Sequence, residues 1–597
     1  MTILGISAFY HDSAAAIIVD GEIVAAAQEE RFSRIKNDPS FPLGAIRWCL
    51  QHAGYELSEL DAVVFYDKPF LKFERLLETY YAFAPKGWLS FLRSMPVWIK
   101  EKLFLKKVIY RELDKVGRLD RRKTTLLFPE HHLSHAASAF YPSPFDEAAI
   151  ITLDGVGEWA TLSICHGKGR SIRVLKELDF PHSLGLLYSA FTYYCGFSVN
   201  SGEYKLMGLA PYGNKDGEAC RRMIELIKTT LVDIRADGSL FLHQEYFDYA
   251  TGYRMVPDGK WEALFGFGRR KEGGILEQCY CDMALAIQLV TEEVFLLLGA
   301  YASQLTGSRN LCLAGGVALN GVANGKLQDA GYFSDIFIQP AAGDAGGALG
   351  AALAAYHIYF EKEREPGDMD AMKGAFLGPG YGEEEIVACL RKHGAQYEQV
   401  KDEEALVERV ARLLAEGNVV GWFQGRTEFG PRALGARSIL ADPGRADMQR
   451  KLNLSIKFRE GFRPFAPAIP LEDVGEYFEG SSPYMLLVKG VKPGRRRALP
   501  EGYSSWNVDD KLQYVRSDLP AVTHIDFSAR VQGVDRRTNS RFWRLLRTFG
   551  KVQGYPVLIN TSFNVKDEPI VNTPEEAWSC FMQTGMDYLV MGDYIVS

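Results

Sequence analysis

Runs of apolar residues separated by short polar turns open the chain. Residues 3–9 form a buried-strand run, and residues 14–19 and 22–27 form two further strand-like segments. Asp20-Gly21 joins the latter two, and this dipeptide tolerates the positive φ angles of a tight hairpin. The pattern therefore predicts three consecutive strands, of which the last two form a hairpin.

The same pattern recurs further along the chain. Residues 148–153 are typical of a buried strand, residues 154–157 (Asp-Gly-Val-Gly) of a turn, and residues 161–165 of the start of another strand. Two β-β-β-α-β-α halves with polar turns facing a cleft describe the actin/hexokinase architecture, in which the turns grip nucleotide phosphates. The repetition predicts this architecture for the first part of the chain.

Glycines follow a third predicted strand, at residues 311–313. Gly315 and Gly316 come directly after it, where they would let a nucleotide approach the backbone closely. A single Gly-Gly pair is weak evidence by itself. Asn320 follows, and residues 348–359 have the pattern of a small-residue helix.

The composition changes after this helix. Residues 361–385 are charged and rich in glycine and proline, which predicts a linker. Beyond it, residues 403–416 have the pattern of an amphipathic helix and residues 419–423 that of a strand. The change in composition therefore marks a boundary, which divides the chain into residues 1–370 and 371–597.

Histidines in one predicted helix are candidate metal ligands. His131 and His135 are four residues apart and share a face, where two imidazoles can reach one metal ion, whereas His132 points elsewhere. Asp154, at the end of the following strand, could complete a site for iron, manganese, zinc or nickel. The alternative is a pair of surface or capping histidines. A metallopeptidase is disfavoured, because His132 stands where His-Glu-x-x-His has its glutamate.

Two other predicted turns carry polar side chains. His11 and Asp12 pair an imidazole with a carboxylate in the first turn, which makes His11 a candidate general base. Hydrogen bonding within the turn would explain the pair equally well. Lys205 lies in the glycine-containing segment 201–213 and could reach an anion.

Basic residues among glycines and prolines mark the C-terminal part. Residues 426–463 carry nine basic and four acidic residues, in a chain whose net charge is −7. Arginine side chains held by rigid turns bind phosphate and carboxylate oxygens bidentately. Interleaved phenylalanines leave nucleic acid as an alternative, but Pro464 and Pro467 favour a fixed anion pocket. The basic residues in question are Arg426, Arg432, Lys457, Arg459 and Arg463.

The composition excludes several classes of protein. A hydrophobic content of 47% with 24% charged residues argues against disorder, a collagen-like fibre, a coiled coil and a globally basic nucleic-acid binder. We find no secretory signal at the N-terminus and no apolar run near the ~20 residues that span a bilayer. The nine cysteines are scattered without zinc-site spacing. We expect a reduced, cytoplasmic protein with neither a nucleic-acid nor a membrane partner.

Together these motifs match a known family. The chain resembles the O-carbamoyltransferases that include the nodulation-protein U enzymes, the tobramycin and cephalosporin carbamoyltransferases and a saxitoxin-pathway enzyme. The resemblance covers essentially the whole chain, and its motifs are specific only in combination. They are residues 5–21, 131–140, 153–159, 203–213, 314–320, 425–443, 456–467 and 560–564.

The resemblance implies an α/β fold and a two-stage reaction. The N-terminal domain would be a duplicated actin/hexokinase-like domain, similar to the ATPases of tRNA threonylcarbamoylation, and the C-terminal domain would be YrdC-like. Carbamoyl phosphate and ATP would yield carbamoyl-adenylate in the C-terminal domain. The carbamoyl group would then pass, in the N-terminal domain, to a hydroxyl of a small-molecule natural product or sugar. Homodimer formation is left open.

The resemblance also implies roles for individual residues. A divalent metal, iron by resemblance with manganese, zinc or magnesium as alternatives, would be held by His131, His135, Asp154 and Asp344. His11 and Asp12 would act at the acceptor site. Nucleotide and carbamoyl phosphate would be bound by Gly155, Lys205, Gly315, Gly316, Asn320, Arg426, Arg432, Lys457, Arg459, Arg463, Arg530, Asn560, Ser562 and Asn564.

Two positions depart from the family pattern. Phe527-Ser528 stands where Gly-Thr is expected, and Asp567 stands where glycine is usual, which would reshape a pocket wall or a turn. Acceptor specificity is expected in irregular loops such as residues 69–107, whose aromatic residues would line a pocket or, as we favour, pack helices. A metallopeptidase and a nucleotide-switched binding protein without chemistry remain alternatives. The second of these leaves the C-terminal arginines unexplained.

Overall fold

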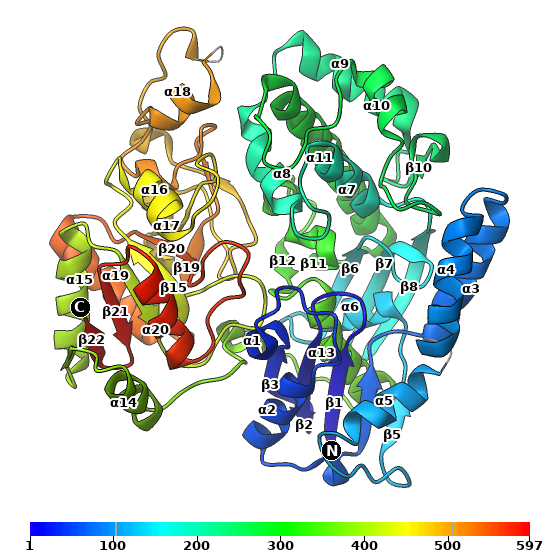
Figure 1. Cartoon of the computed structure of the whole chain (residues 1–597), viewed down its shortest axis with the longest axis horizontal. Helices are drawn as coiled ribbons and strands as arrows, with labels where there is room; N and C mark the ends of the chain where they lie inside the picture. Colours follow the sequence, from blue (N-terminus) through cyan, green and yellow to red (C-terminus); the bar gives the residue numbers. More distant parts are fainter. Residues whose placement is uncertain (102–103, 504–505) are drawn as a thin grey trace. The chain divides into compact units, whose positions relative to one another are not determined.

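The computed structural model describes residues 1–101, 104–503 and 506–597 (Figure 1). The chain forms two compact units, one of residues 1–29 and 39–371 and the other of residues 30–38 and 372–597. Residues 30–38, which include α1 (Glu30–Ser33), therefore belong to the second unit and not to the N-terminal domain that the sequence predicted. Within that unit, Arg31 donates to the carbonyl of Gly430, and Arg34 donates to the carbonyl of Ile570.

The first unit begins with a five-stranded sheet in the order β3-β2-β1-β4-β5. Its strands are β1 (Thr2–Ser7), β2 (Ala14–Val19), β3 (Glu22–Gln28), β4 (Ala62–Phe65) and β5 (Thr125–Leu127). The first three strands are antiparallel, whereas β4 is parallel to β1 and β5 is parallel to β4. The predicted hairpin is confirmed, because Asp20 and Gly21 have φ angles of 50° and 87°.

A second sheet repeats this topology. Its order is β12-β11-β6-β7-β8, built from β6 (Glu147–Leu153), β7 (Ala160–Lys168), β8 (Ser171–Asp179), β11 (Asn310–Ala314) and β12 (Asp335–Ile338). Three antiparallel strands are again followed by two parallel ones. The first unit is therefore an α/β domain with a duplicated actin/hexokinase-like fold, as the repeated sequence pattern predicted.

Two helices between these sheets pack very closely. They are α6 (His131–Phe140) and α13 (Asp344–Ala354), and the latter begins four residues before the predicted helix. A Cβ atom on Gly350 would lie 1.8 Å from the carbonyl oxygen of Ser134 in α6. A Cβ atom on Gly5 in β1 would lie 1.9 Å from the carbonyl oxygen of Ala348. The glycines thus allow α13 to approach both α6 and the first sheet.

Residues 69–107 are largely helical and do not form the irregular loop that we expected. The helices are α3 (Pro69–Ala82), α4 (Trp88–Glu101) and the beginning of α5 (Leu105–Leu113). The aromatic residues Phe70, Tyr81 and Trp88 are exposed, so these three do not pack helices.

One helix is longer and more apolar than the sequence search predicted. Helix α11 (Gln278–Thr306) has the length and composition of a membrane span, and 61% of its most apolar 18-residue window is buried. Scattered polar residues such as Gln288 and Glu292 interrupt its apolar runs, which is why a search for uninterrupted runs missed it. Core helices of globular proteins meet the same criteria. Helix α11 packs against four other helices of this unit, α7 (Leu184–Tyr194), α8 (Glu203–Leu209), α9 (Glu218–Leu226) and α12 (Gly321–Asp329).

The remaining elements of the first unit surround the two sheets. They are α2 (Leu43–Ala53), α7 (Leu184–Tyr194), α8 (Glu203–Leu209), α9 (Glu218–Leu226), α10 (Asp258–Phe265), α12 (Gly321–Asp329) and the hairpin of β9 (Val232–Ile234) and β10 (Leu240–Leu242).

The second unit contains an eight-stranded mixed sheet in the order β13-β22-β21-β14-β15-β20-β16-β19. Its strands are β13 (Tyr397–Gln399), β14 (Val420–Phe423), β15 (Arg437–Ala441), β16 (Ala466–Pro470), β19 (Gln532–Val534), β20 (Leu558–Ser562), β21 (Tyr588–Met591) and β22 (Tyr594–Val596). A two-stranded sheet pairs β17 (Lys489–Gly490) with β18 (Ser528–Ala529).

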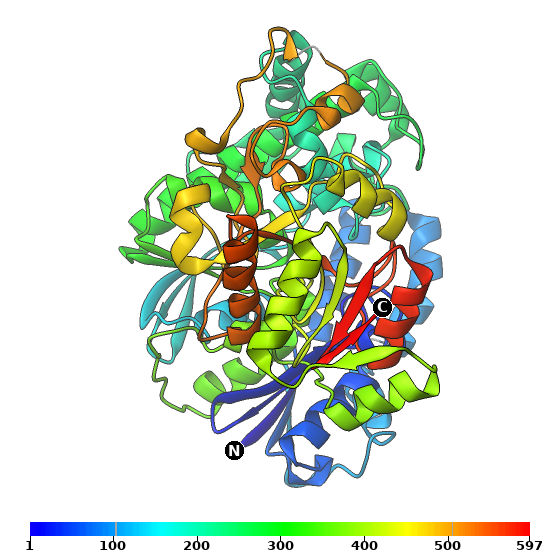
Figure 2. The same cartoon turned by 90° about the vertical axis from the view of Figure 1, so that its left-hand side faces the viewer.

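Helices and loops build one hydrophobic core cluster on each face of the large sheet. Helices α15 (Glu403–Ala415) and α19 (Ser540–Gln553) lie side by side over one cluster (Figure 2). Helices α14 (Glu383–Lys392) and α20 (Pro574–Gln583) contribute to the other. The predicted linker is therefore too long, because α14 begins within it. The shorter helices are α16 (Met448–Lys451), α17 (Val474–Tyr477) and α18 (Val508–Gln513).

Candidate functional sites

The carboxyl ends of three neighbouring parallel strands meet at one edge of the second sheet. Strand β6 leads into Asp154 and Gly155, β11 leads into Gly315 and Gly316, and β12 leads through a short turn to Asp344 at the start of α13. Because Ala314 pairs with Thr152 across β11 and β6, the first two turns are adjacent. Parallel pairing thus gathers residues that are far apart in the sequence.

Four predicted metal ligands come together at this edge. His131 and His135 of α6, Asp154 and Asp344 each offer one donor atom, and these atoms lie within 4.8 Å of one another. The two imidazole Nε2 atoms are 3.0 Å apart, and Nε2 of His131 is 3.0 Å from Oδ2 of Asp154. Oδ1 of Asp344 lies 3.7 Å from both Nε2 atoms. We call these four residues the His-Asp quartet.

The spacing of the quartet fits a metal ion. Two ligand atoms at ~2.1 Å from one ion lie roughly 3.0–3.8 Å apart when their bond angle is ~90–130°. Oδ1 of Asp344, although buried, has no hydrogen-bond partner in the described part of the chain, which leaves this oxygen for a cation. Two imidazoles with two carboxylates suit several divalent metals, and the geometry does not choose among them.

Each carboxylate of the quartet is oriented by a hydrogen bond to its other oxygen. The hydroxyl of Tyr66 donates to Oδ2 of Asp344 at 3.0 Å, which turns Oδ1 towards the imidazoles. The backbone N–H of Gly316 donates to Oδ1 of Asp154 at 3.1 Å, which turns Oδ2 towards His131. Such outer contacts fix the direction of metal ligands.

The quartet keeps its carboxylates ionised. Burial opposes the charge of Asp154, but hydrogen bonds with His131 and His135 hold its pKa well below the usual range. Burial likewise opposes the charge of His135, but its hydrogen bonds with Asp154 and Asp344 raise the pKa to about 9. The carboxylates are therefore ionised, and protons on the neighbouring imidazoles balance their charge where a bound cation would otherwise do so.

His11 and Asp12 lie beside this quartet. Nδ1 of His11 is 3.1 Å from Oδ2 of Asp12, and Nε2 of His11 is 3.8 Å from Oδ2 of Asp344. The negative charge of Asp344 raises the pKa of His11 to about 10, so the imidazole is protonated at neutral pH. Asp12 has a φ of 52°, in the left-handed region that non-glycine residues rarely adopt and that is frequent at functional sites.

The residues of the first unit that the sequence predicts to bind nucleotide have different surroundings in the structure. Gly315 has a φ of 89°, and a Cβ atom there would lie 2.1 Å from the carbonyl oxygen of Leu153. A Cβ atom on Gly155 would meet no atom within 4 Å, so the backbone there is open to a ligand. Asn320 caps α12 and exchanges hydrogen bonds with Gln288, so its amide serves the fold. Lys205 lies partly buried in α8, and its role stays a prediction.

Four arginines of the second unit gather around one position. Burial, followed by the positive charges of Arg432, Arg459 and Arg463, lowers the pKa of Arg530 well below its usual range. The Nε atom of Arg530 is buried without a hydrogen-bond partner among the described residues. Like charges repel, and an anion bound between these four guanidinium groups would relieve the repulsion.

Lys457 is held by two predicted residues of the same region, Ser562 and Asn564. Its Nζ donates to Oδ1 of Asn564 and to the carbonyl of Ser562, both at 2.6 Å. Ser562 in turn donates to Asn564 at 2.7 Å. Burial, then Arg459 and Arg463, lower the pKa of Lys457 well below its usual value. The structure therefore places Lys457, Ser562 and Asn564 next to the arginine cluster.

Other predicted anion-binding residues serve the fold of the second unit. Arg426 donates to the backbone carbonyls of Leu377 and Gly378. Asn560 is buried and donates to Gln532 at 2.7 Å, while its Oδ1 atom has no partner in the described residues. Arg463, which also belongs to the arginine cluster, lies 3.7 Å from Glu460, so part of its charge is offset within the chain. A ligand role for these three remains a prediction.

Sequence reasoning missed two side chains that shape these sites. Tyr66 follows the buried strand β4 directly, and its place at a strand end was the available signal. Arg437 lies within the basic segment 426–463, and its guanidinium is fully buried over the ring of Phe423 and donates to the carbonyl of Gln424 at 2.8 Å. Arg437 therefore supports the turn that carries Arg426 and Arg432.

The two departures from the family pattern share one backbone feature. Phe527 and Asp567 both have a φ of 64°, the left-handed region that favours glycine. The structure thus explains why glycine is expected at both positions, and it shows that this chain adopts the same turns with bulkier residues.

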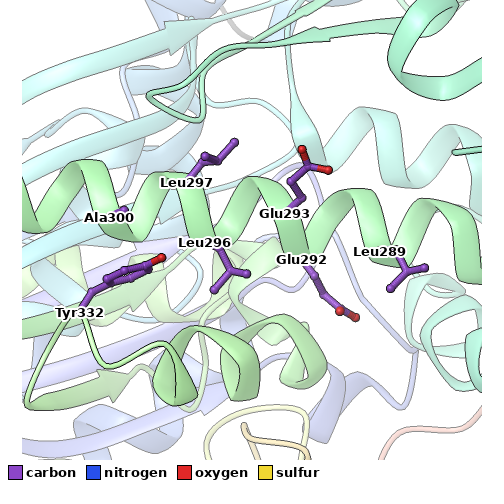
Figure 3. Close-up of a pocket in the computed structure, with 7 residues that line it drawn as sticks. All are labelled: Leu289, Glu292, Glu293, Leu296, Leu297, Ala300 and Tyr332. Atoms are coloured by element: carbon purple, nitrogen blue, oxygen red, sulfur yellow. The ribbon is translucent and has the colours of Figure 1, made fainter. Parts of the chain in front are cut away.

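A separate hollow of about 410 Å³ lies along α11 (Figure 3). Its lining is mostly apolar but includes the carboxylates of Glu292 and Glu293, and Glu293 pairs with Lys228 at 2.7 Å. The other lining residues are Leu289, Leu296, Leu297, Ala300 and Tyr332. Carboxylates repel anions, so this hollow does not suit phosphate groups.

Comparison with known proteins assigns both units to the same family. Residues 2–353 match the family model described as the carbamoyltransferase N-terminus, and residues 411–597 match the carbamoyltransferase C-terminus. The protein sll1178 of Synechocystis is 54% identical over 100% of this chain and 96% of its own length.

Two further relatives carry functional names. Nodulation protein NolNO of Sinorhizobium fredii is 35% identical over 98% of this chain and 79% of its own. The 3'-hydroxymethylcephem-O-carbamoyltransferase of Amycolatopsis lactamdurans is 30% identical over 78% of this chain and 79% of its own. The chain therefore belongs to the carbamoyltransferase family of enzymes.

Proposed function

We propose that this protein is an ATP-dependent O-carbamoyltransferase that uses carbamoyl phosphate and passes the carbamoyl group through carbamoyl-adenylate to a hydroxyl acceptor. The observation that carries the proposal is the arginine cluster of the second unit, Arg432, Arg459, Arg463 and Arg530. Its mutual repulsion is relieved by a multiply charged anion, and both carbamoyl phosphate and ATP are such anions.

Formation of the adenylate is assigned to the second unit. Carbamoyl phosphate is labile in water, so a pocket that offsets its charge and excludes solvent protects it until it reacts. The Lys457 ammonium, held by Ser562 and Asn564, would add positive charge beside the cluster. A YrdC-like fold for this unit is part of the proposal.

Transfer to the acceptor is assigned to the first unit. The acceptor oxygen would bond to the carbonyl carbon of carbamoyl-adenylate, AMP would leave, and the hydroxyl proton would pass to a base. His11 is our candidate for that base, with Asp12 as its partner. A cation held by Asp154 and Asp344 would offset the negative charge that raises the pKa of His11, and the imidazole would then have a free lone pair to accept the proton.

A divalent metal is part of this proposal. His131, His135, Asp154 and Asp344 would hold it, and iron is suggested only by the family resemblance. When bound, the ion would supply positive charge for nucleotide phosphate oxygens at the open turn of Gly155. This assignment is compatible with nucleotide binding by an actin/hexokinase-like fold.

The alternatives are less well supported. A metallopeptidase needs a general base next to the metal, but His132 turns to Thr152 and Ser163, at 2.8 and 2.9 Å from its Nδ1. A nucleotide-switched binding protein would not need the arginine cluster. The cytoplasm remains the proposed location, and a small-molecule natural product or a sugar the proposed class of acceptor.

Substitution of Arg459 tests the proposal. Arg459→Ala should abolish carbamoyl-adenylate formation but preserve metal content and nucleotide binding in the first unit. Arg450→Ala is the matched control, since Arg450 is exposed in α16. Adenylate formation that survives in Arg459→Ala, with the control unchanged, would refute the assignment of this step to the arginine cluster.

A further inference from the structure

The connection between α3 and α4 presents an exposed aromatic and basic surface that the proposed chemistry does not use. Tyr81 ends α3 with 87% of its surface exposed, and Trp88 begins α4 with 61% exposed. Leu89 and Leu92 follow on α4, each more than half exposed. Lys86 and Arg93 are exposed between and beside them. We call these six residues the hairpin tip (Figure 1).

Contacts inside the hairpin hold this tip in place. The rings of Tyr80 and Phe91 meet edge to face at 5.1 Å, and the hydroxyl of Tyr80 bonds to that of Ser90. These contacts join α3 to α4 from the inner side. The exposed side chains are therefore carried by two helices that contact each other through these residues.

A second segment brings another aromatic residue to the same place. Gly87, between the helices, lies so close to the loop at residue 251 that a Cβ atom on it would be 2.6 Å from Cβ of Thr251. Tyr253, two residues further, is 74% exposed and is followed by the exposed Arg254. Two separate parts of the chain thus place exposed aromatic rings beside basic side chains.

The local charge is opposite to that of the whole chain. Residues 81–107 contain six basic and one acidic residues, whereas the chain has a net charge of −7. The exposed acidic residues Glu74 and Glu78 lie earlier on α3, before the tip. At the hairpin tip itself, Lys86 and Arg93 place two exposed positive charges among the aromatic and leucine side chains.

We infer that the hairpin tip docks this protein on the surface of an anionic lipid bilayer. Tryptophan and tyrosine rings are favoured at the headgroup level, leucine enters the acyl boundary, and lysine and arginine pair with anionic headgroups. Protein interfaces are also enriched in tryptophan, tyrosine and arginine, although not in lysine, so the test below includes a protein partner as one of its outcomes. This inference goes beyond the proposed carbamoyl transfer and replaces our expectation of no membrane partner.

Vesicle sedimentation with the full chain tests the inference without any carbamoyl chemistry. The probes are vesicles of phosphatidylcholine alone and vesicles with about 30% phosphatidylglycerol, which imitates an anionic leaflet. We expect binding to the anionic vesicles, weak binding to the neutral ones, and loss of binding in ~1 M salt, where the Debye length is only ~3 Å.

Two variants separate the apolar and the charged contributions. One double variant combines Trp88→Ser with Leu92→Ser, and the other combines Lys86→Glu with Arg93→Glu. Each double variant should lower the vesicle-bound fraction about tenfold, equivalent to ~1.4 kcal/mol in binding free energy. Ile275→Ser is the matched control, because Ile275 is an exposed apolar residue of the first unit outside the tip. Circular dichroism of every variant verifies that it is folded.

Two results would overturn the inference. One is that the same fraction of the protein sediments with and without anionic vesicles. The other is a wild-type dimer that the Trp88→Ser, Leu92→Ser variant converts to a monomer while neither protein binds vesicles. That second outcome would assign the hairpin tip to contact between two copies of the chain.

Discussion

The Nε2 atoms of His131 and His135 lie 3.0 Å apart, one turn from each other on α6. Two imidazoles at this distance either share one proton or direct both lone pairs at a common cation. The carboxylates of Asp154 and Asp344 face the same point, and neither is oriented by the imidazoles alone. Residues behind the carboxylates should therefore control metal affinity.

Tyr66→Phe tests this control. The substitution removes the hydrogen bond from the Tyr66 hydroxyl to Oδ2 of Asp344 and lets the carboxylate rotate. We expect metal affinity to fall ~10–100-fold, as for other outer-shell partners of metal ligands. Metal content after competition with a chelator measures the change, and Tyr80→Phe is the control at a distance. Equal metal retention in both variants would mean that Tyr66 does not position Asp344.

Gly350→Ala tests the close packing that brings α13 to α6. A Cβ atom there would lie 1.8 Å from the carbonyl oxygen of Ser134, so the helices must separate. We expect a stability loss of ~1–3 kcal/mol or more from overpacking, together with lower metal content. Gly343→Ala is the matched control, since a Cβ atom at Gly343 meets nothing within 4 Å. A Gly350→Ala protein with unchanged melting temperature would contradict the packing argument.

Local features of the first unit were predictable from the sequence because each depends on neighbouring residues. Asp20-Gly21 predicted its hairpin, and the spacing of His131 and His135 predicted their shared face on a helix. Asp344 was assigned only by family resemblance. Its approach to Asp154 depends on the parallel pairing of β12, β11 and β6, which no local pattern encodes.

Features that depend on long-range contacts were missed or misplaced. Residues 30–38 join the second unit through contacts such as that of Arg34 with the carbonyl of Pro569. Arg437 and Arg426 lie in one basic motif, but both guanidinium groups donate to backbone carbonyls. A sequence shows that a residue is basic and does not show whether it lies buried or faces a ligand.

The pH dependence of anion binding tests the place of Lys457. The pKa of Lys457 is lowered in the absence of an anion, and a bound anion would raise it again. At any pH between these two pKa values, anion binding is therefore accompanied by the uptake of a proton. Affinity for inorganic sulfate, whose own charge is constant, should fall as pH rises through this window, by at most about tenfold per pH unit. Titration calorimetry in the alkaline range measures it.

Two variants complete the pH experiment. Lys457→Gln should bind sulfate more weakly and lose the slope, whereas Lys451→Gln, which alters a lysine paired with Asp587, should keep it. A slope that persists in Lys457→Gln would assign the proton to another group.

Asp567 provides a test of backbone strain. Its φ of 64° costs most L-residues ~1–2 kcal/mol relative to glycine, and it costs aspartate less. Against this, folding costs a glycine ~0.5–1 kcal/mol more in conformational entropy than it costs other residues. Asp567→Gly should therefore be neutral or slightly stabilising, whereas Asp567→Val should lower the melting temperature. Differential scanning fluorimetry compares them. Equal melting temperatures for the glycine and valine variants would show that the turn is not strained.

The account rests on a shared carbamoyl-adenylate, and omission of one substrate at a time tests it most directly. Candidate hydroxyl compounds are incubated with the enzyme, ATP and carbamoyl phosphate, and AMP and carbamoylated product are followed by mass spectrometry. We predict that both appear together and only when ATP and carbamoyl phosphate are both present. Carbamoylation of an acceptor at the same rate without ATP would contradict the account.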